Sequence, residues 1–527
     1  MLQPVLIGGE WRQSRSPQGE FQAVSPLDQE ASGDRFPISG TEDLDQALAE
    51  AQAAISSLDK SSPDRIASFL EIYAQNIERN AEPLVRMAAE ETALPIEPRL
   101  LTIELPRTVD QLRQAAAAAQ DRSWCQAVID TRLNIRSKFS RLGGPIVVFG
   151  PNNFPLAFNS IAGGDFAAAM AAGNSVIAKA HPGHPGTTRL LAEYARQALQ
   201  DSHLPSSMCQ MIYHLSDAAG LDLVSQHAVG ATAFTGSRKS GLALKRAADC
   251  AGKPIYLELS GVNPVLVLPG ALEERAEEIA SELSGSCTLG AGQFCTNPGL
   301  VILIGGEYSQ RFLQHLGHNL ETTPTAPLLS RGVRENLSEA IAHFKTYGAQ
   351  VLCGGYSSEE QGFHYANTLL SVPGRIFLKN SEPLRQEAFG PVTVAVLAHD
   401  EAELLMILEN LEGNLTGSVY SQSQGKDDAL YARVEPILRP RVGRLINDKM
   451  PTGVAVNPAM VHGGPFPATG HPGFTSVGIP RSLLRFAALQ CYDNVRLRRL
   501  PVELQNKNPT GNMWRYIDGA WTQKDIL

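Results

Sequence analysis

The stretch PIVVFGPNNFPLAFNSIAGGDFAAAMAAGNSVIAK, residues 145–179, decides the fold of this chain. It starts with a short apolar strand at 145–149, turns at 150–155, and continues through a small-residue helix at 160–172 into a second apolar strand at 175–179. Short strands that are apolar throughout are typical of parallel sheets covered by helices on both faces. The stretch therefore predicts an α/β fold.

The same alternation extends on both sides of this stretch. Downstream, helices at 188–200 and 240–251 alternate with strands at 210–213 and 231–235. This order predicts a doubly wound parallel sheet, which binds ligands beyond the carboxyl ends of its strands. After Gly261 the pattern restarts with a strand at 264–268 and a helix at 272–284, so we expect a second α/β domain.

Upstream of the central stretch the patterns differ. The first forty residues have the pattern of short strands and turns. Helices are expected from Thr41, an N-cap candidate, to about residue 119. Within that range, Ser62-Pro63 marks the start of another helix. Residues 126–142 predict an exposed hairpin.

Composition narrows the class of protein. The 527 residues carry 45 basic and 54 acidic side chains, a net charge of −9, which argues against broad binding of nucleic acid or anionic membranes. With 43% hydrophobic and 19% charged residues, the chain is not intrinsically disordered. The seven cysteines form no CxxC pair, the N-terminus resembles no secretory signal, and the apolar stretch 161–180 contains Asp165 and Lys179. We expect a cytoplasmic protein without a membrane span.

Two local motifs are weak alone. The glycine turn at 236–241 lacks the Lys and Ser/Thr of a triphosphate loop, but it opens a helix whose N–H groups suit a pyrophosphate; a plain turn is the alternative. His181 and His184 are separated by Pro and Gly, with no nearby Cys or carboxylate. We interpret them as a structural loop and predict no metal site.

Three residues carry candidate chemistry. Cys295 lies between glycines in GAGQFCTNPG, where it is either a nucleophile or a small buried hydrophobe. Glu258 lies between leucines at a strand end and is either a general base with a raised pKa or a satisfied structural carboxylate. Asn153 either donates its amide to an oxyanion or stabilises a turn.

The combined order of these segments resembles the aldehyde dehydrogenase superfamily over nearly the whole chain. The matching blocks are GPNNFP, VIAKAHPGHPG, FTGS, LELSG, GQFCTNPG and EAFGPV. The resemblance implies a Rossmann-like cofactor domain at 1–122 and 144–262, a catalytic α/β domain at 263–480, and a β arm formed by 123–143 and 481–527.

The arm implies oligomers. By the resemblance it pairs subunits into a homodimer or homotetramer, and the strand-like residues 495–498 would extend a neighbour's sheet. Trp514 and Trp521, in a polar tail, suggest docking on another subunit.

The resemblance also implies residue roles. Cys295 would attack the aldehyde, Asn153 and the backbone N–H of Cys295 would hold the oxyanion, and Glu258 would activate water to hydrolyse the thioester. The implied cofactor residues are Lys179 at the adenosine ribose, Gly236 and Ser237 at the pyrophosphate, Glu387 at the nicotinamide ribose, and Phe389 beside that ring. The implied aldehyde tunnel is lined by Phe154, Phe158 and Ile161.

The predicted cofactor is NADP, with NAD possible. Many NAD-preferring relatives carry a Glu three residues after the ribose lysine, and this chain has Pro182 there. Without that carboxylate a 2′-phosphate is not repelled and Lys179 can pair with it.

The blocks KAHPGHPGT, GQFCTNPGL and PTGVAVNPAMVHGGPFPAT resemble those of α-ketoglutaric semialdehyde dehydrogenases, and NADP-dependent fatty-aldehyde dehydrogenases share similar blocks. One departure is at 470–474, where Gly473 replaces an expected Arg and His471 is the sole candidate cation. The leading substrate is α-ketoglutaric semialdehyde, and the main alternative is a medium or long-chain aliphatic aldehyde. Two other classes are a binding protein that has lost catalysis and a thioesterase-like hydrolase that uses Cys295 without redox chemistry. Intact Cys295, Glu258 and Asn153 speak against the first, and Lys179 and Glu387, which by resemblance hold a dinucleotide, speak against the second.

Overall fold

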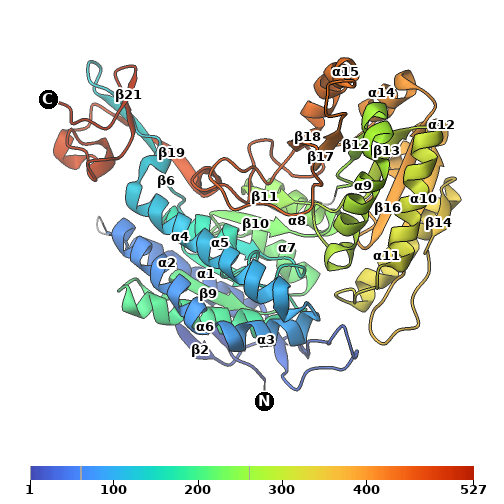
Figure 1. Ribbon diagram of the computed structural model, residues 1–527. Coiled ribbons are helices and arrows are strands. Elements are labelled where there is room, and N and C mark those ends of the chain that lie inside the picture. The colour runs from blue at the N-terminus through green and yellow to red at the C-terminus, as the bar shows by residue number, and fades with distance from the viewer. Residues whose placement is uncertain (1, 60–61, 260) are drawn as a thin grey trace.

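The computed structural model describes residues 2–59, 62–259 and 261–527. Its first sheet is seven-stranded, in the order β11-β10-β7-β8-β9-β1-β2 (Figure 1). The strands from β11 to β9 run parallel, and β1 joins antiparallel to β9. The strands are β1 (Val5–Ile7), β2 (Glu10–Arg12), β7 (Ile146–Phe149), β8 (Val176–Lys179), β9 (Cys209–Ile212), β10 (Ala231–Thr235) and β11 (Ile255–Glu258).

Helices pack around this sheet and share one apolar core with it. They are α1 (Thr41–Ser56), α2 (Ser62–Arg79), α3 (Ala81–Thr92), α4 (Leu105–Asp121), α5 (Gly164–Ala171), α6 (Pro185–Asp201), α7 (Asp217–Ser225) and α8 (Arg238–Cys250). A small two-stranded sheet, β3 (Gly19–Phe21) and β4 (Phe36–Ile38), lies near the N-terminus. The predicted doubly wound, largely parallel sheet is confirmed.

The parallel register aligns the carboxyl ends of four strands. Phe149 of β7 pairs with Lys179 of β8 and with Phe234 of β10, and Thr235 of β10 pairs with Glu258 of β11. The segments that follow these strand ends therefore lie along one edge of the sheet, where doubly wound folds bind ligands.

A second seven-stranded sheet follows, in the order β14-β15-β16-β13-β12-β17-β18, with β14 alone antiparallel to its neighbour (Figure 1). Its strands are β12 (Val265–Val267), β13 (Leu300–Ile304), β14 (Gln350–Cys353), β15 (Thr368–Pro373), β16 (Val392–Ala398), β17 (Asn414–Tyr420) and β18 (Val442–Asn447). Its helices are α9 (Pro269–Thr288), α10 (Glu307–Thr322), α11 (Arg331–Thr346), α12 (Gly374–Lys379), α13 (Ser381–Leu384), α14 (Glu401–Glu409) and α15 (Asp428–Leu438). Two apolar clusters cover this sheet, one of them under α9 and α10.

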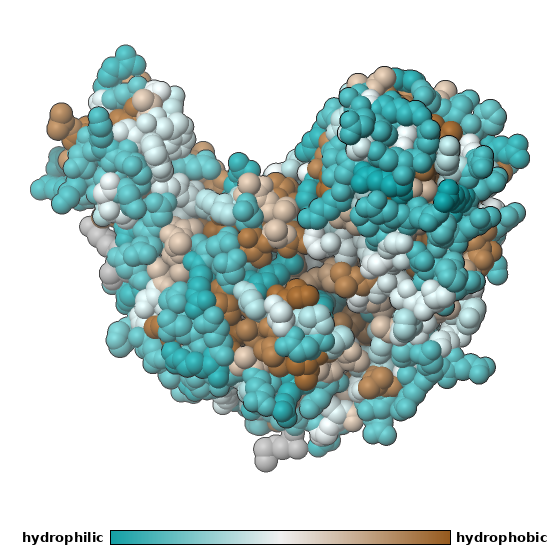
Figure 2. Space-filling view, in the orientation of Figure 1, coloured by the Kyte–Doolittle hydropathy of each residue, from teal (hydrophilic) through white to brown (hydrophobic). Residues whose placement is uncertain are grey.

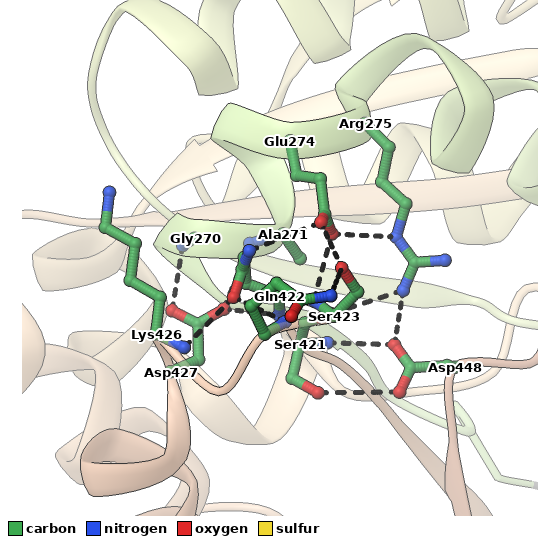
Figure 3. Close-up of polar contacts among 11 residues, drawn as sticks. Gly270, Ala271, Glu274, Arg275, Ser421, Gln422, Ser423, Lys426, Asp427 and Asp448 are labelled. Atoms are coloured by element: carbon green, nitrogen blue, oxygen red, sulfur yellow. Dashed lines mark hydrogen bonds and ion pairs between the residues drawn. The ribbon is translucent and has the colours of Figure 1, made fainter.

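A polar cluster fixes the start of α9 against the ends of β17 and β18 (Figure 3). The carboxylate of Asp427 accepts hydrogen bonds from Gly270 N and Ala271 N, at 2.8 and 3.0 Å, in the first turn of α9. This places an anion at a helix N-terminus, where the helix dipole favours it. Arg275 leaves helical geometry (φ −152°, ψ 42°) and its guanidinium contacts Asp448 at 2.6 Å. The cluster thus anchors the helix whose other end leads into the Cys295 loop.

The third sheet, β19-β6-β5-β20-β21, forms an arm that stands away from both larger sheets (Figure 1). The predicted hairpin is present as β5 (Val128–Asp130) and β6 (Ile135–Arg141), and β19 (Ala487–Asp493), β20 (Arg515–Ile517) and β21 (Ala520–Thr522) complete the sheet. A hollow separates the arm from the second α/β unit (Figure 2).

Three local predictions are corrected. The helix predicted at 160–172 begins only at Gly164, because residues before it form turns in which Asn159 Oδ1 accepts from Ile161 N. Thr41 is the first residue of α1, and Gly40 is the N-cap. The strand expected at 495–498 is absent; those residues lead into a short 3₁₀ turn, Leu497–Arg499, and β19 is the strand that pairs with β6. No helix of the described residues is long and apolar enough to cross a membrane.

Candidate active site

One open cleft, with a volume of about 410 Å³, brings together most residues singled out from the sequence. It lies at the carboxyl ends of β7, β8, β10 and β11 and is closed on the other side by loops of the second sheet. Eight predicted site residues line it: Asn153, Lys179, Gly236, Ser237, Glu258, Cys295, Glu387 and Phe389. The size suits a dinucleotide and the lining suits both a cofactor and a reacting group.

One end of the cleft is cationic. Burial lowers the pKa of Lys179 to about 8, and no carboxylate oxygen of the described residues is recorded within 4 Å of its ammonium group. His181 and His214 lie close enough that the charge of Lys179 helps to lower their pKa values. Nearby, Ser237 caps α8 by accepting a hydrogen bond from Ser240 N, and the first turn of that helix faces the cleft. A buried lysine beside a helix N-terminus supplies the charge and the N–H donors that a phosphorylated dinucleotide requires.

On the opposite wall of the cleft, the backbone of the Cys295 loop packs against the backbone of residues 387–391. Gly292, at φ +68°, lies so close to the segment carrying Glu387 and Phe389 that a Cβ there would come within 2.1 Å of Gly390 O. Asn297 Nδ2 also donates to Gly390 O at 3.3 Å. Glycine at this position therefore allows the Cys295 loop and the 387–391 segment to form a single wall.

Cys295 is held by its backbone. Asn263 Nδ2 donates to Cys295 O at 2.9 Å and to Asn297 O at 3.0 Å, and Asn263 Oδ1 accepts from Thr416 on β17. This ties the loop to the second sheet and leaves the sulfur facing the end of β11 on the first sheet.

A histidine that sequence reasoning missed completes the site. His462 Nε2 lies 2.7 Å from Glu258 Oε1 and 3.3 Å from Cys295 Sγ. His462 and Glu258 are both almost fully buried, and Cys295 is partly exposed. Both contacts are made by His462 Nε2, and Glu258 also hydrogen-bonds the Cys295 thiol directly. The sulfur, the imidazole and the carboxylate thus form a triangle in which the carboxylate can accept the thiol proton.

Electrostatics set the resting protonation of these groups. Burial would raise the pKa of Glu258, but the charge and hydrogen bond of His462, with a hydrogen bond from Ser476, lower it below the usual value. Of the two alternatives for Glu258, the raised pKa does not hold, because hydrogen-bonding partners from a distant part of the chain satisfy the carboxylate. Burial and the charge of Glu258 raise the pKa of the Cys295 thiol well above its usual value. The resting pair is a thiol beside a carboxylate.

The segment at 475–476 positions the base. Ser476 Oγ donates to Glu258 Oε2 at 3.0 Å, and Thr475 Oγ1 accepts from His462 N at 2.9 Å. His471, considered as a cation for the substrate, is exposed instead and packs on Tyr256 with ring centroids 5.9 Å apart. This segment therefore serves the base rather than a substrate carboxylate.

Asn153 sits opposite the sulfur on a rigid turn. Its Nδ2 donates to Gln293 O at 2.7 Å and so keeps a second N–H. Arg99, paired with the buried Glu104, donates to the backbone carbonyl of Asn153 at 2.9 Å. Glu104 Oε1 accepts from Leu156 N and Ala157 N, at 2.8 and 2.9 Å. One buried ion pair thus fixes the whole turn.

An aromatic cluster follows this turn. Phe154, Phe158 and Phe294 pack together, and the Phe158 ring lies 5.9 Å from that of His462. Ile161, assigned to the same wall by resemblance, lies instead in the core of the first sheet, where its backbone carbonyl accepts from Tyr73. A second arginine, Arg107 of α4, lies over Phe158 at 5.0 Å and over Phe154 at 5.6 Å.

The side chains that could bind a metal ion lie at the same site. Within the described ranges, the ligand atoms of Glu258, Cys295 and His462 lie within 4.8 Å of one another. His181 and His184 are occupied by loop contacts: His181 Nδ1 accepts from Gly183 N, and His184 Nε2 lies 2.9 Å from Pro151 O. The prediction of no metal remains a prediction.

His462 and Arg107 escaped sequence reasoning for different reasons. His462 lies in the block MVHGGPFPAT, which carried a resemblance but no role, and 204 residues separate it from Glu258. Arg107 lies in an ordinary amphipathic helix. The sequence offers one indirect indication of it: the predicted tunnel residues Phe154 and Phe158 are apolar, so recognition of a polar substrate requires a polar side chain from another segment.

Comparison with known proteins agrees with this geometry. Residues 11–453 match the model of the aldehyde dehydrogenase family. The chain is 37% identical, over 90% of its length and 91% of the relative's, to α-ketoglutaric semialdehyde dehydrogenase 2 of Azospirillum brasilense. It is 35% identical to α-ketoglutaric semialdehyde dehydrogenase of Acinetobacter baylyi, over 95% and 96% of the two chains. Among solved structures, lactaldehyde dehydrogenase of Escherichia coli superposes with a TM-score of 0.80, over 93% of this chain and 98% of that one, at 22% identity.

Proposed function

This chain belongs to the aldehyde dehydrogenase family and oxidises aldehydes; from that premise we propose that it oxidises α-ketoglutaric semialdehyde with NADP through a covalent intermediate on Cys295. The observation that carries the mechanism is the contact of Cys295 Sγ with the buried His462–Glu258 pair. The substrate assignment is supported by two relatives of that name, at 37% and 35% identity over nine tenths or more of the chain.

The first step removes the thiol proton. Because the pKa of Cys295 is raised, the sulfur needs a base in contact with it. The Glu258 carboxylate, which hydrogen-bonds the thiol, takes the proton, and His462 holds that carboxylate in place through its Nε2 contact at 2.7 Å. The thiolate then attacks the aldehyde carbon and forms a thiohemiacetal.

Asn153 stabilises the negative oxygen of that adduct. The second N–H of its amide and the backbone N–H of Cys295 are the donors for the oxyanion. A dinucleotide bound in the cleft supplies the hydride acceptor for oxidation of the thiohemiacetal to a thioester. Once Glu258 has passed the thiol proton to solvent, its carboxylate deprotonates the water that hydrolyses the thioester. The leaving thiolate takes up that proton, and the acid and the free thiol are released.

The preference for NADP rests on the cationic end of the cleft. Lys179 has no carboxylate partner among the described residues, and Pro182 occupies the place of the glutamate that would repel a 2′-phosphate. A 2′-phosphate would bind the ammonium group of Lys179, while the N-terminus of α8 would hold the pyrophosphate.

A spectrophotometric rate at 340 nm tests the assignment. The purified protein is offered α-ketoglutaric semialdehyde, hexanal and decanal, each with NADP and with NAD, and Cys295→Ala serves as the inactive control. The highest kcat/KM is expected for the semialdehyde with NADP. A kcat/KM that rises from hexanal to decanal and exceeds that of the semialdehyde would move the enzyme to aliphatic aldehydes, which the cluster of Phe154, Phe158 and Phe294 also favours.

A further inference from the structure

Arg107 carries a guanidinium edge without a protein partner. The residue lies in the first turn of α4, and its Nε and Nη2 atoms are buried yet have no hydrogen-bond partner among the described residues. No carboxylate of those residues is recorded within ion-pair distance of it. A buried guanidinium edge left without an acceptor costs free energy, so it marks a place where an acceptor is bound from outside.

The other arginines around the site are already occupied. Arg99 gives one Nη to Glu104 and the other to Asn153 O. Arg444 gives its two Nη groups to Pro451 O and Gly453 O, at 2.8 and 3.1 Å, and so holds the loop beside the aromatic cluster. Arg107 differs from both in that its bidentate edge is available.

Arg107 also faces the reacting groups. Its guanidinium lies over the ring of Phe158, and the same ring packs against His462. Burial lowers the pKa of Arg107, and the charge of Glu104, followed by those of Cys295 and Glu258, opposes that effect, so Arg107 lies within the electrostatic reach of the reacting groups. Arg107, Phe158 and His462 are absent from the lining of the dinucleotide cleft, and they connect to Cys295 through the contact of His462 with its sulfur.

The free atoms match a carboxylate. Nε–H and Nη2–H lie on one edge of the guanidinium and point in the same direction, which is the arrangement that binds both oxygens of a carboxylate. The rings of Phe154 and Phe158 hold the guanidinium flat by cation–π contact and suit the short methylene chain of a semialdehyde.

We propose that Arg107 binds the carboxylate of the substrate while Cys295 attacks its aldehyde, and that this residue sets the preference for aldehydes that carry a terminal carboxylate. The inference rests on the proposed function and assigns the cation that residues 470–474 do not supply. It makes Arg107 a substrate-binding residue rather than a participant in proton transfer.

The test compares substrates of equal carbon number. For wild type, Arg107→Met and Arg107→Lys, we would measure kcat/KM with α-ketoglutaric semialdehyde, 5-oxopentanoate and pentanal at saturating cofactor. Arg107→Met is expected to lower the ratio of kcat/KM for semialdehyde to that for pentanal by about 100-fold, mainly through KM, because a charge-assisted bidentate contact is lost. Arg107→Lys keeps the charge but not the edge, so it should retain an intermediate ratio.

Arg113→Met is the matched control. It removes an arginine from the exposed face of the same helix, where Arg113 pairs with Glu78, and should leave the ratio unchanged. Thermal unfolding and cofactor binding of each variant report whether it folds.

Each outcome separates the two proposals. Equal losses for semialdehyde and pentanal in Arg107→Met would overturn the carboxylate role and make Arg107 a stabiliser of the thiolate. If wild type prefers 5-oxopentanoate over pentanal but shows no such preference for α-ketoglutaric semialdehyde, the proposed substrate is overturned. The role of Arg107 would still stand in that case, provided that Arg107→Met loses the preference for 5-oxopentanoate. A wild type indifferent to the carboxylate would overturn both.

Discussion

Cys295 is a thiol at neutral pH in this environment, because burial and the Glu258 carboxylate raise its pKa. Its reactivity therefore depends on the Glu258 carboxylate, which His462 orients through its Nε2 contact at 2.7 Å. We predict that His462→Gln slows alkylation of Cys295 by iodoacetamide at pH 7 at least tenfold and lowers kcat by about 10²-fold or more. The measurement is the alkylation rate against pH, followed by mass spectrometry of the modified residue.

His471→Gln is the control for that experiment, since this histidine lies on the outside of the sheet. Equal alkylation rates in wild type and His462→Gln at every pH would show that Glu258 accepts the thiol proton without being oriented by the imidazole.

Lys179 gives a second prediction at the scale of one residue. Burial sets its pKa at about 8, so the ammonium form predominates at pH 7 and is largely lost by pH 9 in the free enzyme. A 2′-phosphate needs the charged form, so affinity for NADP should fall as pH rises through 8, while affinity for NAD changes little. Calorimetric titration of both cofactors at pH 7 and 9 measures this difference, and Lys179→Gln should abolish it. A parallel fall for the two cofactors would place Lys179 away from the 2′-phosphate.

Single residues also mark where sequence reasoning ended. Cys295, Glu258 and Asn153 stand in short blocks with flanking glycines or strand ends, so their positions could be inferred. His462 and Arg107 carry no local signal, because what matters for each is a neighbour more than 50 residues away. For the same reason the sequence left two alternatives open for the Glu258 carboxylate, and its distant partners decide for the lowered pKa.

At the scale of elements, the start of α4 and the turn after β7 behave as one unit. The buried Arg99–Glu104 pair contacts the backbone of Asn153, Leu156 and Ala157. We predict that Glu104→Ala destabilises the protein by about 3 kcal/mol or more, because it leaves a buried guanidinium without its partner. It should also lower kcat by releasing the turn that holds Asn153.

Thermal unfolding and steady-state rates of Glu104→Ala, with the exposed Glu82→Ala of α3 as reference, provide the check. A variant with wild-type kcat but a lowered melting temperature would confine the pair to a stabilising role.

Elements also differ in how well their sequences predict them. The apolar strands β7, β8 and β10 are found within a residue of their predicted limits, because burial on both faces leaves no alternative pattern. The helix predicted at 160–172 starts four residues late, because alanine content gives no information about the Asn159 turn that precedes it. Residues 495–498 have an apolar/charged alternation like that of a strand, but Pro501 and the 3₁₀ turn at Leu497–Arg499 follow them.

At the scale of the molecule, the arm predicts an assembly. Its edge strand β19 has one side unpaired among the described residues, and Leu489 on it is 66% exposed. Trp521 at the other edge is 55% exposed. Unprotected edges and exposed apolar side chains favour pairing with another chain. We predict a homodimer or homotetramer.

Light scattering of the eluting protein tests that assembly, and Leu489→Asp should shift it toward the monomer. The exposed Leu352 of β14, outside the arm, is the matched position for a control substitution. A wild-type monomer at about 10 µM would contradict the role given to the arm.

The active site draws Asn153 and Glu258 from the first sheet, Cys295 from a loop of the second, and His462 from the segment that returns between them. During refolding from denaturant, each sheet can form its own core before the two dock. Dehydrogenase activity then reports the last event, docking, rather than the recovery of helical signal. Chains trapped with both units folded but not docked would show near-native circular dichroism and yet remain inactive. The active fraction of a preparation is therefore measured by titrating the reactive thiol.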